Sequence, residues 1–124
     1  MTLRALLALH AFVTAAAGIV LAIVPAAIPA AVGIVLDPSA YLVAYFISGA
    51  EFAIAYLSLR AVTLQGEALR LAVQTIVVFH AATGLLEMYA LLQGVDPRLW
   101  LNLILRIIVI ILFSWFGFRR LSYA

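Results

Sequence analysis

The sequence predicts an all-α fold: a bundle of four transmembrane helices that forms a single domain over residues 1–124. Apolar residues make up 69% of the chain and charged residues only 10%, against about 45–50% and about 25% in ordinary soluble domains. The chain also contains four apolar runs of the length (about 20 residues) at which a helix crosses the hydrocarbon of a bilayer. None of these runs alternates apolar and polar residues as a membrane β-strand would.

The four predicted spans are 6–24, 41–59, 71–92 and 99–118. Pro25 ends the first run, and Gly94 follows the third. An Asp-Pro pair precedes each of the other two, at 37–38 and 96–97. Asp is a favourable N-cap, and Pro suits the first helical position because its missing N–H would have no partner there. We therefore expect the second and fourth helices to be capped by these pairs.

Arginine placement predicts the direction of insertion, because basic residues collect on the cytoplasmic side. The chain has seven arginines and no lysine. Five of them flank one side of the membrane: Arg4, Arg60, Arg70, Arg119 and Arg120. Only Arg98 flanks the other side, so both termini are predicted to be cytoplasmic. The composition is typical of a GC-rich bacterial genome, which favours a bacterial inner (plasma) membrane.

The connection at 25–36 is apolar, uncharged and too short to cross the bilayer again. We expect it to form a short interfacial segment between the first and second helices, either as a connector or as a lid. The chain also contains a weak internal repeat. The spacing from Asp37 to Arg60 equals that from Asp96 to Arg119, and His10 and His80 lie in similar local sequences. The repeat predicts two helical hairpins of the same orientation.

Three charged residues, Glu51, Glu87 and Arg106, lie well inside the predicted spans. Each costs about 2.5–3.5 kcal/mol at mid-bilayer on insertion scales unless it is paired, neutralised or hydrated. Steps of three and four residues place them on stripes with other polar side chains, including Ser48 and Ser58 beside Glu51 and His80 beside Glu87, and we take these stripes as the bundle interior. The predicted intramembrane polar cluster comprises Glu51, His80, Thr83, Glu87, Asn102 and Arg106.

Counting residues from the span ends places Glu51 and His80 near the midplane, with His10 deeper than His80 by about 6 Å. Arg106 is expected to reach Glu87, Glu51 or both. One interpretation is a structural clamp that fixes helix register; another is a midplane site for a ligand or a proton. A third is a haem or a chlorophyll-type pigment held by His10 and His80, because histidine is a common axial ligand.

Several chemistries lack their sequence signals. The chain has no cysteine, no glycine-rich phosphate loop and no HExxH motif. Ser48, Ser58 and Ser114 lack the context of a nucleophile elbow. No catalytic or metal-binding residues are therefore predicted, and an enzyme is the less favoured class. The scattered arginines also make a nucleic-acid partner unexpected.

The layout is similar to that of the small multidrug exporters, which share this length, four helices and a membrane glutamate. Those exporters carry their essential acid in the first helix, where this chain has His10 and Thr14, and they lack a strong charge bias. The chain as a whole more closely resembles small four-span bacterial membrane proteins of DoxX-like layout. This resemblance is one of arrangement and transfers no residue roles.

These observations predict an accessory or structural subunit, or a small-ligand-binding protein, of a bacterial inner-membrane complex. The alternative is a proton-coupled small transporter or channel that uses Glu51 and His80. A further alternative is an electron-transfer or photosynthetic subunit that binds haem or pigment through His10 and His80. The expected partners are the lipid bilayer and either other membrane subunits or further copies of the chain.

Overall fold

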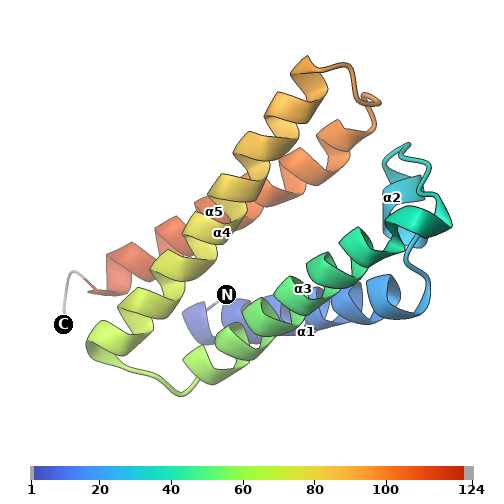
Figure 1. Ribbon diagram of the computed structural model, residues 1–124. Coiled ribbons are helices and arrows are strands. Elements are labelled where there is room, and N and C mark those ends of the chain that lie inside the picture. The colour runs from blue at the N-terminus through green and yellow to red at the C-terminus, as the bar shows by residue number, and fades with distance from the viewer. Residues whose placement is uncertain (1, 122–124) are drawn as a thin grey trace.

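The computed structural model describes residues 2–121, with side chains described as far as residue 117. Its elements are α1 (Leu3–Ile23), α2 (Ala27–Ala31), the 3-10 turn η1 (Pro38–Ala40), α3 (Tyr41–Ala61), α4 (Gly66–Leu92) and α5 (Leu99–Leu121). Figure 1 shows this order. No strand occurs within the described range. The all-α prediction is therefore confirmed.

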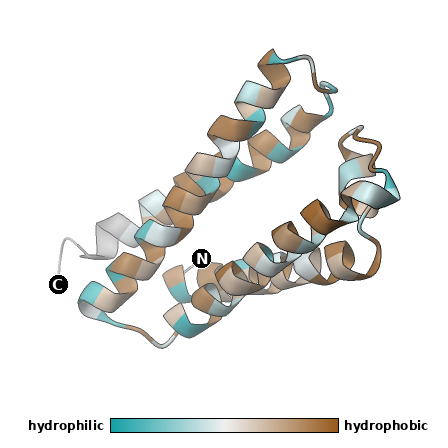
Figure 2. Ribbon diagram, in the orientation of Figure 1, coloured by the Kyte–Doolittle hydropathy of each residue, from teal (hydrophilic) through white to brown (hydrophobic). Residues whose placement is uncertain are grey.

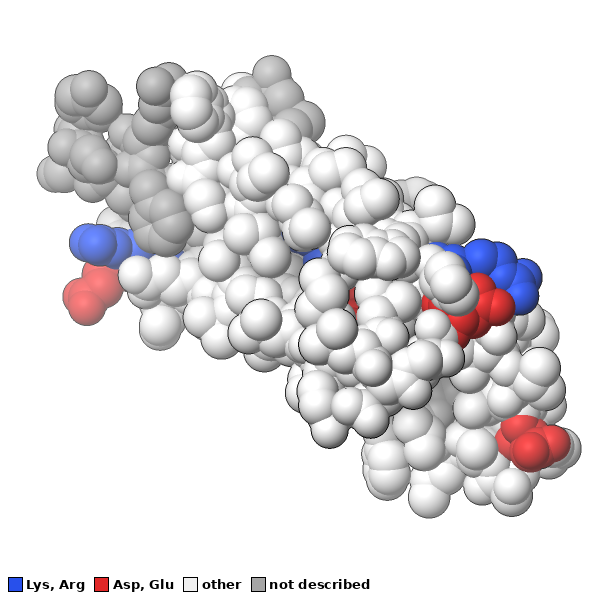
Figure 3. Space-filling model, turned by 90° about the horizontal axis from the view of Figure 1, so that it is seen from above, with Lys and Arg blue, Asp and Glu red and all other residues white. Residues whose placement is uncertain are grey.

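Four of these helices are long and apolar enough to cross a membrane: α1, α3 with its η1 turn, α4 and α5. Figure 2 shows apolar residues along all four, with polar residues at the turns and at intervals along the helices. Large apolar side chains such as Phe12, Phe46 and Leu85 are 70–74% exposed. On the face seen in Figure 3, charged side chains gather towards the extremities. A lipid environment accounts for this surface, and the chain is a multi-pass membrane protein.

The helix starts differ from the predicted ones where polar residues extend a helix beyond its apolar run. The α1 helix begins at Leu3 instead of residue 6, because the hydroxyl of Thr2 accepts a hydrogen bond from the Ala5 N–H at 3.2 Å. The α4 helix begins at Gly66 instead of residue 71, and Glu67 in its first turn complements the helix dipole.

The two Asp-Pro pairs behave differently. Oδ1 of Asp96 accepts a hydrogen bond from the Arg98 N–H at 2.8 Å, so this residue caps the turn that leads into α5. The Asp37 side chain makes no capping hydrogen bond, and Pro38 opens η1 instead of α3 itself. The predicted side-chain cap at residue 37 is therefore wrong. The intervening 3-10 turn moves the start of α3 to Tyr41, three residues beyond the proline.

The helices form two hairpins, with α1 packed on α3 and α4 packed on α5 (Figure 1). Small residues allow a close approach within the first pair, where the Ser48 hydroxyl donates to the Gly18 carbonyl at 2.8 Å. We call the end that holds the start of α1, the α3–α4 turn and the end of α5 the terminal end. The opposite end, with α2 and the α4–α5 turn, is the distal end.

The hairpins meet at the terminal end and diverge towards the distal end (Figure 1). A buried apolar core joins them there and includes Leu7, Val73, Ile76 and Phe113, all fully buried. This core draws on α1, α4 and α5, and Ala61 at the end of α3 completes it. The buried apolar core therefore joins the long helices of the two hairpins at the terminal end.

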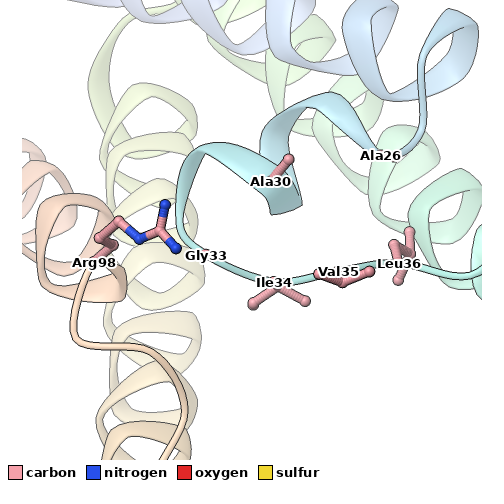
Figure 4. A pocket seen from close by; sticks show the side chains of 7 residues that line it. All are labelled: Ala26, Ala30, Gly33, Ile34, Val35, Leu36 and Arg98. Atoms are coloured by element: carbon pink, nitrogen blue, oxygen red, sulfur yellow. The ribbon is translucent and has the colours of Figure 1, made fainter.

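The predicted short segment between the first two long helices is present as α2 and the chain that follows it. Gly33 has a positive φ of 80°, and a Cβ added to it would overlap the Asp96 carboxyl group. Arg98, in the turn just before α5, points towards Gly33 (Figure 4) and lines a hollow of about 230 Å³ together with residues of the segment. The segment therefore connects the two hairpins at the distal end, where they are otherwise apart.

Candidate functional site

A series of hydrogen-bonded polar side chains crosses the bundle interior, and we call it the polar seam. Its members are Ser58 of α3, His10 of α1, His80 and Glu87 of α4, and Asn102 and Arg106 of α5. His10, Ser58 and His80 are buried. The seam therefore links all four long helices through side chains, next to the apolar core at the terminal end.

The hydrogen bonds of the seam assign a tautomer to each histidine. The Ser58 hydroxyl donates to the Ile54 carbonyl at 2.8 Å, so its oxygen accepts from His10 Nδ1–H, also at 2.8 Å. In a neutral His10, Nε2 then has no proton and accepts from His80 Nε2–H at 2.8 Å. His80 Nδ1 is left as an acceptor for Arg106 Nη1 at 3.3 Å. The two neutral histidines therefore carry their protons on different ring nitrogens.

An added proton on either ring would disrupt this arrangement. Protonated His10 would present an Nε2–H to the Nε2–H of His80, which sets two donors against each other. His80 could relieve that conflict only by moving its proton to Nδ1, where it would face the donor Arg106. The seam as built therefore accepts only neutral imidazoles.

The other end of the seam is an ion pair between α4 and α5. Arg106 Nε donates to Glu87 Oε1 at 2.8 Å, and both side chains are only 13% exposed. Asn102 Nδ2 donates to the same oxygen at 2.6 Å. The second oxygen, Oε2, is buried and has no hydrogen-bond partner among the described residues. An unsatisfied buried acceptor costs about 1–3 kcal/mol, so this oxygen lowers the net stabilisation that the pair provides.

A groove of about 420 Å³ opens between the hairpins, with Glu87 and Arg106 on one wall and Glu51 on the other. Most of its lining is apolar and comes from α3, α4 and the start of α5. These apolar lining residues include Ile47, Phe79, Leu86, Val95 and Leu99. Ile34, from the chain after α2, also lines it. Its volume lies within the range of small-molecule sites, about 300–1,000 Å³.

The groove contains polar groups that the protein leaves unused. Glu51 forms no hydrogen bond or ion pair with any described residue, although the charge of Arg106 acts on it electrostatically. Arg106 has five N–H groups and uses two, one to Glu87 and one to His80, so three meet no acceptor within the described part of the chain. The Thr83 hydroxyl donates to the Phe79 carbonyl at 2.7 Å and keeps only its acceptor capacity.

The six predicted cluster residues thus divide into two sets. His80, Glu87, Asn102 and Arg106 lie in the seam, whereas Glu51 and Thr83 face the groove, which Glu87 and Arg106 also line. The expected link between Arg106 and Glu51 is not a hydrogen bond. Sequence reasoning placed Ser58 on the interior stripe but missed its bond to His10, because a serine carries no signal of its partner.

The predicted depth difference between His10 and His80 does not keep their rings apart, since their Nε2 atoms are in hydrogen-bond contact at 2.8 Å. Counting residues along upright helices ignores the inclination of α1 against α4 (Figure 1) and the reach of each ring. The contact also leaves no room for a porphyrin, whose iron would have to lie between the two Nε2 atoms. The pair therefore does not fit bis-histidine haem ligation. No group of three or more metal-ligating side chains occurs among the described residues.

Comparison with protein-family models, curated proteins and solved structures found no match for this chain. The DoxX-like layout accordingly remains a prediction. Any functional conclusion must come from the seam and the groove themselves.

Proposed function

We propose that this chain is a membrane-embedded binding protein that takes up a small, mainly apolar molecule in the groove between its hairpins. The observation that carries this proposal is an apolar groove of about 420 Å³ in which polar groups of Glu51 and Arg106 have no partner among the described residues. Ligand sites combine an apolar lining with a few polar groups that fix orientation. A bacterial inner membrane, which the composition favours, and cytoplasmic termini, which the arginine distribution favours, belong to this proposal.

The seam contains a paired acid and the groove an unpaired one, and this difference supports ligand binding over a purely structural role. A register clamp needs its charges paired, and Arg106 with Glu87 meets that need. Glu51 contributes nothing to such a clamp, because it forms no ion pair with a described residue. Placing an unpaired acid against an apolar wall is costly. A ligand that pairs with the Glu51 carboxyl would offset this cost.

Proton-coupled transport through Glu51 and His80 is the second candidate, and one observation favours it. The groove lies towards the distal end, while Leu7 and Phe113 pack fully buried in the core at the terminal end. Access to the groove from one side only is one of the two states that alternating access requires. The transporter would also need to break the seam, and flux of a bound probe into proteoliposomes would detect this.

The binding proposal is tested by filling the groove. The full chain is placed in lipid nanodiscs with naphthylmethylamine and naphthylmethanol, two fluorescent probes of similar shape, and binding of each is measured by fluorescence anisotropy. Ala50→Phe puts an aromatic ring on the groove lining, and we expect it to abolish binding of any probe that the wild type binds. Ala22→Phe is the matched control on an exposed face of α1 and should leave binding unchanged.

Two outcomes would overturn the proposal. One is a wild-type chain that binds neither probe above the level of empty nanodiscs. The other is an Ala50→Phe variant that binds them as the wild type does. Circular dichroism and a thermal melt of each variant establish that the bundle is intact, so that lost binding is not mistaken for lost folding.

A further inference from the structure

We propose that the ligand of the groove is an apolar amine, bound as its ammonium ion by the carboxylate of Glu51. This inference rests on the proposed function and adds the chemical class of the ligand. Three properties of the groove lead to it: its net charge, its free hydrogen-bond acceptors, and the distribution of its apolar surface.

The net charge of the groove favours a cation. Its lining contains three ionisable side chains, Glu51, Glu87 and Arg106. Arg106 and Glu87 neutralise each other at 2.8 Å, which leaves the carboxyl of Glu51 in excess. One positive charge on a ligand balances it, whereas an anion would add a third negative group to the groove. If Glu51 takes up a proton in the empty groove, the arriving ammonium replaces that proton.

The free acceptors match an ammonium group. A primary ammonium has three N–H donors and no acceptor. The groove offers the two oxygens of Glu51 and the remaining acceptor capacity of Thr83. The three unused N–H groups of Arg106 could serve an anion, but that anion would lie beside two carboxylates. Hydrogen bonds to charged groups are the stronger ones, so the Glu51 carboxylate decides the preference.

The remainder of the ligand must be apolar and compact. Phe79 and Leu86 of α4 and Ile47 of α3 provide the broad surfaces of the groove. A body of one or two rings, or of branched hydrocarbon, fits the available 420 Å³ and covers these side chains. A hydrophilic cation without such a body would leave the apolar walls uncovered.

The test compares the naphthylmethylamine and naphthylmethanol probes on the full-length protein in nanodiscs, with empty nanodiscs correcting for partition into lipid. The wild type should bind the amine at least tenfold more tightly than the alcohol, equivalent to about 1.4 kcal/mol. Glu51→Gln keeps the side-chain size but removes the charge, and should lower amine affinity to that of the alcohol while leaving the alcohol unchanged. Glu67→Gln, in the exposed first turn of α4, is the matched control and should keep the full preference.

Equal affinity of the wild type for amine and alcohol would overturn the ammonium assignment, as would a Glu51→Gln variant that retains the preference. If both probes bind equally and Ala50→Phe abolishes both, the groove remains a binding site and only the ligand class is wrong. If neither probe binds, the groove proposal fails and this inference fails with it. Should Glu51→Gln not fold, naphthylacetate serves as an anionic probe on the wild type, and binding as tight as that of the amine would refute the assignment.

Discussion

Replacing Arg106 by alanine tests whether the Arg106–Glu87 pair holds α4 and α5 together. The variant removes the donor at 2.8 Å from Glu87 and the donor at 3.3 Å from His80. Glu87 would keep only the Asn102 amide as a partner in the described part of the chain, and its second oxygen already has none. The substitution therefore leaves a nearly buried carboxylate without a counter-charge.

The expected loss follows from the burial of the pair. Breaking a buried ion pair by removing one partner destabilises a protein by about 3–5 kcal/mol. Both side chains are 13% exposed, so some solvent screening remains and we expect a loss near the lower end, about 3 kcal/mol. Arg106→Leu combined with Glu87→Leu removes both charges together, and should recover most of this loss because apolar replacement of a whole pair is often neutral.

The assay is reversible unfolding of the full chain in mixed detergent micelles, followed by circular dichroism as the fraction of denaturing detergent rises. Arg98→Ala is the control, because its guanidinium pairs with Asp96 at the exposed distal end and should contribute little. A loss below about 1 kcal/mol for Arg106→Ala would refute the buried-pair reasoning. So would a double variant as unstable as the single one.

Three further predictions concern other parts of the molecule. His80→Leu should lower the free energy of unfolding by about 1–3 kcal/mol in the same assay, because the polar groups on either side of it in the seam lose their hydrogen-bond partner. An unchanged free energy of unfolding would contradict the seam. The hydrogen bonds and charge of Arg98 hold the pKa of Asp96 below its usual range. The stability that this contact provides should therefore be present at neutral pH and be lost as the pH falls through the pKa of Asp96 in the folded protein. An NMR titration that gives Asp96 an ordinary pKa would contradict this prediction. Because the chain lacks cysteine, the single variants Thr63→Cys and Gln93→Cys show on which side of the membrane each turn lies. An impermeant maleimide added to intact spheroplasts should label only Gln93→Cys. Labelling of Thr63→Cys alone would show that the topology is the reverse of the predicted one.

The number of helices and the faces that they bury could be predicted from sequence, because both depend on the local pattern of apolar and polar residues. Apolar run length sets the number of spans, and steps of three and four residues identified the interior stripes, on which Ser48, Ser58 and His80 are indeed buried. Helix starts were less predictable, since Thr2 and Glu67 extend helices through polar sequence that a hydropathy count excludes.

The site was predictable in its residue types but not in its partners. The placement of both glutamates and Arg106 on interior stripes was enough to expect that Arg106 pairs with Glu87, Glu51 or both, and the ion pair is with Glu87. The contact between His10 and His80 depends on how α1 and α4 are inclined, which no local pattern encodes. The same applies to Glu51, which faces a groove because the hairpins diverge at the distal end, whereas parallel helices would have brought it closer to Arg106.

The hydrogen-bond directions in the polar seam bear most directly on the claim that neutral side chains join the two hairpins. Nitrogen-15 NMR of histidine-labelled protein in lipid measures them, because protonated and unprotonated ring nitrogens have distinct shifts and an N–H···N bond transmits a scalar coupling. We predict protons on Nδ1 of His10 and Nε2 of His80, with a coupling between the two Nε2 nuclei. Both histidines in one tautomer, either as an imidazolium, or no coupling across the Nε2 pair would contradict the seam.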